Sequence, residues 1–145
     1  MLRQGISVKD GFAWCGKIKQ SDSAIARAAN VDRRVVRSTI ESICSDEYMS
    51  SLFSKFNSML LLADAASLIG CSAIEIVPVD ASVPGVMAGI LNVLYEARIN
   101  VRQAVVSDPE SDRFSHLIIT VDGTIPGDVM TKVRNCRSVS SVIIK

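Results

Sequence analysis

Apolar positions recur with two different periods along this chain, and the change falls near residue 71. Before it, apolar residues return every three or four positions, which predicts amphipathic helices. After it, short runs rich in Ile and Val alternate with helical segments, which predicts strands and helices in turn. Gly11 and Gly16 weaken the first expected helix by about 1 kcal/mol each. In the first part we expect helices over residues 7–18, 23–29, 33–43, 46–56 and 59–69, the last ended by Gly70.

The helix expected over residues 33–43 separates polar from apolar side chains most cleanly. At about 100° per residue, its polar side chains fall within an arc of about 140° and its apolar side chains lie opposite. Asn30 suits a left-handed turn before this helix and Asp32 suits its N-cap, so the segment predicts a helix-turn-helix. The polar set is Arg33, Arg34, Arg37, Ser38 and Glu41, and the apolar set is Val35, Val36, Thr39, Ile40 and Ile43.

The second part of the chain predicts the element order βαββαβ. Pro78 belongs at a sheet edge or a strand end, and Pro84 suits the first turn of a helix. This order indicates a ferredoxin-like sandwich with both helices on one face of the sheet. The expected class is α+β, with a helical domain at 1–58, a connecting helix at 59–71 and a second domain at 72–145. The expected strands are 73–79, 99–106, 113–121 and 139–144, the helices 84–97 and 127–135, and the hairpin turn 108–112.

A formal net charge of +1 hides an asymmetry between the two parts. Residues 1–58 contain nine basic and six acidic residues, whereas the remainder contains seven and nine. A polyanionic partner is therefore expected to bind the first part. The four cysteines form no Cys-x-x-Cys pair, which favours reduced thiols in the cytoplasm. Because no signal-peptide core and no run of about 18 apolar residues occurs, we expect a soluble protein without a membrane partner.

The segment IARAANVDRRVVRSTI resembles the helix-turn-helix of lac-repressor-like and related bacterial and archaeal regulators. The resemblance depends on Ala26, on the turn at 30–31, and on Val36 and Ile40. It implies binding to double-stranded DNA, in which Arg33, Arg34 and Ser38 face base edges and Arg37 faces phosphates. An arginine-bearing helix face is also compatible with a solvated surface or with a protein contact.

The segment SVPGVMAGILNVLYEARINV and the final VSSVIIK resemble the ACT family of amino-acid-sensing domains, over nearly all of 72–145. The resemblance implies a homodimer or higher homo-oligomer with an amino acid effector between protomers. Gly85 lets a ligand carboxylate approach backbone N–H groups at a helix start, and Asn100 can both donate and accept hydrogen bonds. The family usually has an acid at the position of Ser82 and glycine at that of Arg98. The implied ligand-binding residues are Asp80, Ser82, Val83, Pro84, Gly85, Val86, Asn100 and Val101.

Both resemblances together are typical of archaeal ACT-domain regulators of amino-acid metabolism, which implies a transcription regulator controlled by an amino acid. We expect no enzymatic activity, cofactor or metal, because His116 is the only histidine and no catalytic triad, metal-ligand pair or phosphate loop occurs. A second hypothesis is a regulatory subunit that docks on an amino-acid biosynthetic enzyme through its N-terminal helices. A third is a structural oligomer without a ligand.

Overall fold

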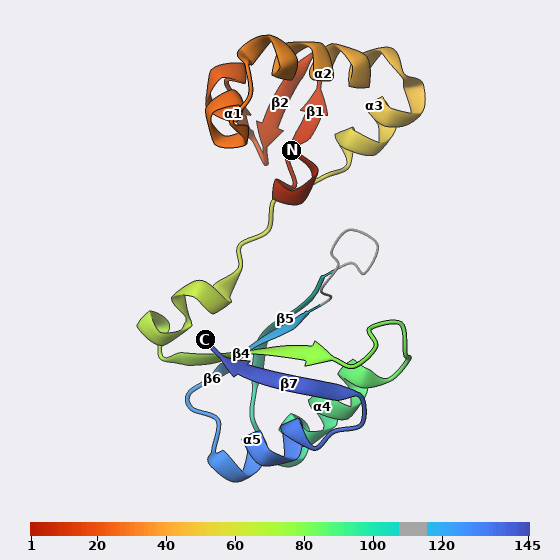
Figure 1. Cartoon of the computed structure of the whole chain (residues 1–145). Helices are drawn as coiled ribbons and strands as arrows, with labels where there is room; N and C mark the ends of the chain where they lie inside the picture. The colour runs from red at the N-terminus through yellow and green to blue at the C-terminus, as the bar shows by residue number, and fades with distance from the viewer. Residues whose placement is uncertain (108–115) are drawn as a thin grey trace. The chain divides into compact units, whose positions relative to one another are not determined.

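The computed structural model describes residues 1–107 and 116–145, which fold as two compact units. The units are Met1–Leu60 and Leu61–Lys145 (Figure 1). Each unit combines helices with one antiparallel sheet, so the expected α+β class is confirmed. Among the described residues, no helix is both long enough and apolar enough to cross a membrane.

Residues 7–20 of the first unit form three strands, so the helix expected over residues 7–18 is wrong. Asp10 and Gly11 both have positive φ, 53° and 75°, as a two-residue type I′ hairpin turn requires. Gly16, with φ 59°, starts a second tight turn. The two turns bring apolar residues to a helix-like spacing along the sequence. After a short 3-10 helix η1 (Leu2–Gln4), the strands are β1 (Ser7–Lys9), β2 (Phe12–Cys15) and β3 (Ile18–Gln20), paired in that order.

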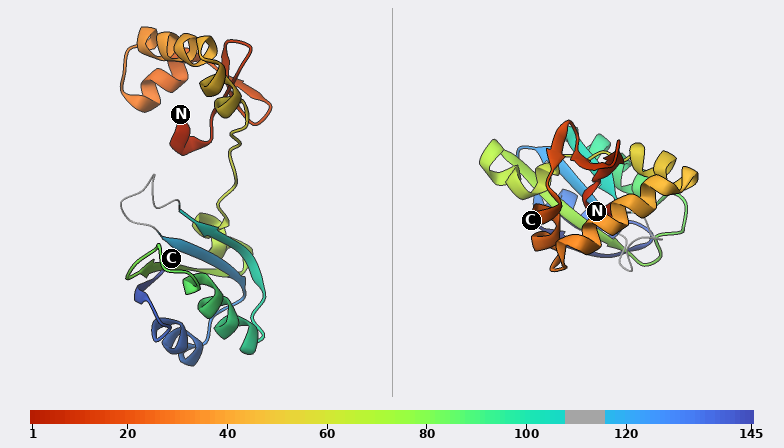
Figure 2. Two further views of the ribbon diagram at one scale, coloured as in Figure 1. Left: turned by 90° about the vertical axis from the view of Figure 1, so that its right-hand side faces the viewer. Right: turned by 90° about the horizontal axis from the view of Figure 1, so that it is seen from above.

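Three α-helices follow these strands and cover one face of the small sheet (Figure 2). They are α1 (Asp22–Ala29), α2 (Arg33–Ser45) and α3 (Glu47–Ser54). Val8 and Ala13 from the sheet are almost fully buried, and they pack with apolar residues of the helices. Val35 and Thr39, which we expected on the apolar face of α2, are exposed. The buried stripe of α2 consists of Val36, Ile40 and Ile43. It is narrower than the expected apolar face because α2 packs only against α1, α3 and the hairpin.

The second unit contains a four-stranded sheet with α4 and α5 on one face (Figures 1 and 2). The strand order is β5-β6-β4-β7, and all neighbours are antiparallel. Pro78 ends β4 at a bulge, which is compatible with its lack of an N–H donor. The expected turn at 108–112 and the beginning of the strand expected over 113–121 lie outside the described residues. The elements are β4 (Cys71–Pro78), α4 (Val86–Glu96), β5 (Val101–Val106), β6 (Leu117–Asp122), α5 (Gly127–Arg134) and β7 (Val139–Ile144).

Alternate residues of the central strands point toward the two helices and form the main core. Ile74 and Ile76 of β4 are buried between β6 and the helices, as the period of two in this strand predicts. Ile90 and Leu94 of α4 are fully buried against them. In place of the helix expected over 59–69, a 3-10 helix η2 (Leu62–Ile69) packs Ala63 and Ala66 against Cys71, Ala73 and Ile118.

Candidate functional site

The α1–turn–α2 motif of the first unit is held in shape by local capping bonds. The Ser21 hydroxyl accepts a hydrogen bond from Ala24 N at the start of α1, and Asn30 ends that helix with φ 53°. The carboxylate of Asp32 accepts a hydrogen bond of 2.7 Å from Arg34 N and thereby caps α2. The caps predicted at Asn30 and Asp32 are thus confirmed. They fix the angle at which the beginning of α2 leaves the turn.

The exposed face of α2 contains the four residues that the sequence assigned to DNA binding. Arg33, Arg34 and Ser38 are exposed, and they line a shallow hollow together with Arg37. Asp22 of α1 and Glu41 line the same hollow, so acidic side chains interrupt the positive surface. The face is therefore cationic at its N-terminal end and mixed in charge further along the helix.

Arg37 differs from the other two arginines because protein atoms already engage its guanidinium. Its Nε donates to Glu41 Oε1 at 2.9 Å, and its Nη1 donates to the carbonyl oxygen of Gly11 at 3.1 Å. These bonds tie α2 to the turn between β1 and β2. The structure therefore gives Arg37 a positioning role and leaves Arg33 and Arg34 as the exposed guanidinium groups of the face.

The loop between β4 and α4 contains most of the sequence-predicted ligand residues. The Asp80 carboxylate accepts hydrogen bonds from the Ser82 hydroxyl at 2.6 Å and from Ser82 N at 2.9 Å. Both bonds lower the pKa of Asp80, the hydroxyl bond contributing most. The two predicted residues thus bind each other and stiffen the loop on the approach to Val83 and Pro84.

Gly85 is the N-cap of α4 and has a φ of 94°, a conformation that residues with a Cβ rarely adopt. Because Gly85 is not helical, α4 begins after it, and Pro84 precedes the helix instead of lying in its first turn. The first helical bond joins Gly89 N to Gly85 O at 3.0 Å. No side chain caps this end of α4. The N–H groups of its first turn therefore remain available to an anionic group.

Replacing Gly85 with alanine should lower the free energy of unfolding by about 1–2 kcal/mol, because alanine is strained at this φ. Apart from its two chain neighbours, no residue has an atom within 4 Å of the added Cβ, so the effect comes from backbone strain. Gly89→Ala is the matched control inside the same helix, where φ is not positive and the space is equally open. That variant should be stabilised by about 1 kcal/mol. Thermal unfolding followed by circular dichroism measures the stability of both variants. A change of the same sign in their midpoint temperatures would contradict a strained N-cap at Gly85.

Asn100 and Val101, the other predicted ligand residues, lie at the opposite end of the sheet from Gly85. Asn100 Nδ2 donates to Asp122 Oδ2 at 2.6 Å, and Asp122 N donates to Asn100 O at 3.0 Å. The bonds from Asn100 and then Arg102 lower the pKa of Asp122. Because β5 runs parallel to β4, its beginning is separated from the end of β4 by the length of the strand, about 20 Å. One copy of the chain therefore does not bring all eight predicted residues together.

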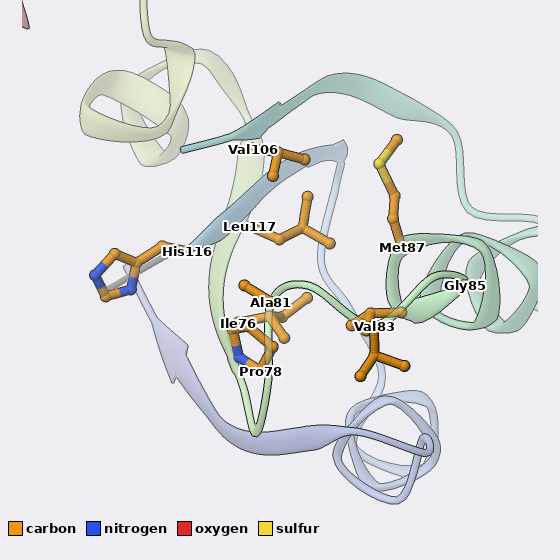
Figure 3. A pocket seen from close by; sticks show the side chains of 10 residues that line it. Ile76, Pro78, Ala81, Val83, Gly85, Met87, Val106, His116 and Leu117 are labelled. Atoms are coloured by element: carbon orange, nitrogen blue, oxygen red, sulfur yellow. The ribbon is translucent and has the colours of Figure 1, made fainter. Parts of the chain in front are cut away.

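A pocket of about 150 Å³ lies at the Gly85 end of the sheet (Figure 3). It is bounded by the end of β4, the following loop, the first turn of α4, and the facing ends of β5 and β6. Three of the predicted residues, Val83, Gly85 and Val86, line it. The sequence did not single out Met87, Val106 and Leu117, which come from three separate elements. The signal that could have identified Val106 and Leu117 was their place at the ends of neighbouring strands.

His116 borders the pocket but its ring points away from it (Figure 3). Its Nδ1 lies 2.9 Å from Glu75 Oε1, and Lys145 Nζ lies 2.7 Å from Glu75 Oε2. His116 and Lys145 thus form a polar cluster around the carboxylate of Glu75. Among the described residues, no group of three or more His, Cys, Asp and Glu side chains is placed to hold a metal ion.

Comparison with known proteins gives no match to a protein-family model or to a curated protein sequence. The features of the molecule that indicate a function are the capped α1–turn–α2 motif and the pocket beside Gly85.

Proposed function

We propose that this chain is a transcription regulator that binds double-stranded DNA and responds to an amino acid. The observation that carries the proposal is the capped two-helix motif, in which Arg33, Arg34 and Ser38 are exposed within the first two turns of α2. Guanidinium groups bind guanine edges or phosphates well, and a helix of this length fits the major groove. A net excess of three basic residues in 1–58 favours the same partner.

For the second unit we propose an ACT-type module with the ferredoxin-like arrangement. Support comes from the order β4-α4-β5-β6-α5-β7, from the strand order β5-β6-β4-β7, and from both helices packing on one face. The glycine N-cap of α4 and the adjacent pocket support an amino acid as the ligand.

Self-association through this module is part of the proposal. Gly85 and Asn100 lie too far apart in one copy to contact one small ligand, whereas β5 is an outer strand of the sheet. Antiparallel pairing of β5 with β5 of a second copy would align the beginning of one strand with the end of the other. Such a pair would bring a second Asn100 toward Val106 and the pocket. Sedimentation analysis should then give at least a dimer.

A gel-shift titration with duplex DNA, run at several salt concentrations with and without amino acids, tests the proposal. DNA affinity should fall steeply with salt, because phosphate contacts release counterions. A coupling of about 1–3 kcal/mol between the two units would change DNA affinity about five- to 150-fold when the effector binds. Salt-insensitive binding, or none in any condition, would exclude the DNA-binding function.

A regulatory subunit that docks on an amino-acid biosynthetic enzyme is the second candidate. Tyr48 and Leu52, one turn apart on α3, are exposed and could form part of a protein contact. If this second function is correct, an enzyme should co-purify with the chain. Replacing Arg33 and Arg34 with alanine should then cause no loss of function.

A further inference from the structure

The side chains around the pocket beside Gly85 are mostly apolar. They are aliphatic or thioether groups, contributed by Ile76, Pro78, Val83, Met87, Val106 and Leu117. His116 also lines the pocket, but its Nδ1 lies 2.9 Å from Glu75 Oε1, and its ring points away from the pocket (Figure 3). A polar or charged group placed against the apolar side chains would give up hydration without gaining a partner from them, whereas an alkyl group would gain apolar contact. The walls therefore suit an alkyl group.

The start of α4 offers the pocket a different kind of contact. Gly85 and Val86 line the pocket, and they belong to the uncapped start of this helix. Backbone N–H groups at such a helix start, reinforced by the helix dipole, bind a carboxylate. Gly85 leaves the approach to this backbone open, since no side chain projects from it. A ligand with an alkyl group at one end and a carboxylate at the other matches both contacts.

The volume of the pocket is large enough for the side chain of an aliphatic amino acid. An apolar cavity of about 150 Å³ accommodates a group as large as benzene. A side chain of three or four heavy atoms therefore fits such a space.

From these apolar walls, this uncapped helix start and this volume, we propose that the pocket binds an α-amino acid with an aliphatic side chain, of the valine, leucine, isoleucine or methionine type. The inference depends on the proposed amino-acid-binding function and adds the ligand class to it. Met87 and Val106 determine specificity, because they supply the walls from α4 and β5 that face the loop.

Calorimetric titration of the full chain with glycine, alanine, valine and leucine tests the ligand class. Each added methylene should tighten binding about fourfold, so leucine should bind about 50-fold more tightly than alanine. Asparagine and threonine, which resemble leucine and valine in shape, should bind no more tightly than alanine. Leucine methyl ester, which lacks the carboxylate charge, should lose most of the affinity.

Two variants test the walls directly. Val106→Thr and Met87→Gln keep the approximate side-chain volume and should each weaken leucine binding about tenfold. Val79→Thr is the matched control, because Val79 is 73% exposed and does not line the pocket. It should bind leucine as the unchanged chain does. Equal effects of Val79→Thr and Val106→Thr would overturn the assignment of the walls.

The possible failures are distinguishable. If asparagine or threonine binds more tightly than leucine, the aliphatic class is wrong and the amino-acid-binding function stands. If none of these amino acids binds at millimolar concentration, the amino-acid part of the proposed function fails and the inference fails with it. If leucine methyl ester binds as tightly as leucine, the carboxylate contact is wrong.

Discussion

Replacing Gly5 with alanine should destabilise the first unit by about 3 kcal/mol. Gly5 has a φ of 59°, which costs alanine about 1–2 kcal/mol. The added Cβ would also overlap the backbone of Asn57 and lie 2.9 Å from Ser58 N. Overpacking of this kind costs about 1–3 kcal/mol, since backbone atoms cannot rotate away. Denaturant unfolding followed by the fluorescence of Trp14, the chain's single tryptophan, reports this unit.

Gly16→Ala provides a closely matched control for this variant. Gly16 has the same φ of 59° in the same unit, but nothing lies within 4 Å of an added Cβ. It should therefore show only the effect of backbone strain, about 1–2 kcal/mol. The difference between the two variants measures the cost of crowding the added Cβ against the backbone at 57–58. Ser58 Oγ holds this backbone close to the N-terminal turn by donating to Gln4 O at 2.8 Å. Equal destabilisation of the two variants would contradict the close packing of Gly5 against residues 57–58.

The first unit shows where sequence periodicity misleads. Val8, Phe12, Cys15 and Ile18 have helical spacing, but two tight turns separate them into three strands. The Asp10-Gly11 pair was the local signal for a hairpin, because both positions need positive φ. In contrast, the end of α1 and the start of α2 followed from capping residues, whose preferences are determined by their own backbone conformation.

The second unit was more predictable because its strands are buried and rich in Ile and Val. Periods of two and 3.6 are distinct there, and the strand expected over 139–144 coincides with β7. The candidate ligand site was only partly predictable. In a strand-helix-strand unit, the helix runs back along the sheet, so Gly85 and Asn100 fall at opposite ends. Val106 and Leu117 join Gly85 through strand pairing, which no local pattern reveals.

Replacing both Arg33 and Arg34 with alanine should weaken DNA binding by about 100-fold or more. Each arginine that binds a base edge or phosphate contributes about 1–3 kcal/mol to DNA binding. The slope of log affinity against log salt concentration should also become shallower, by about one for each phosphate that is no longer bound. Neither guanidinium makes the hydrogen bonds that hold Arg37, so stability should change little. Fluorescence anisotropy with labelled duplex DNA at several salt concentrations measures both affinity and slope.

Lys132→Ala with Arg134→Ala removes the same charge from α5 and separates local binding from net charge. If Arg33 and Arg34 bind DNA directly, this control should weaken DNA binding much less than the α2 pair does, because it removes the same charge without removing the guanidinium groups that contact DNA. Glu41→Gln should raise DNA affinity, since it removes a negative charge from the hollow on α2. An equal decrease in affinity for the α2 and α5 pairs would mean that DNA responds only to overall charge, and the assignment of α2 as the DNA-reading helix would then be wrong.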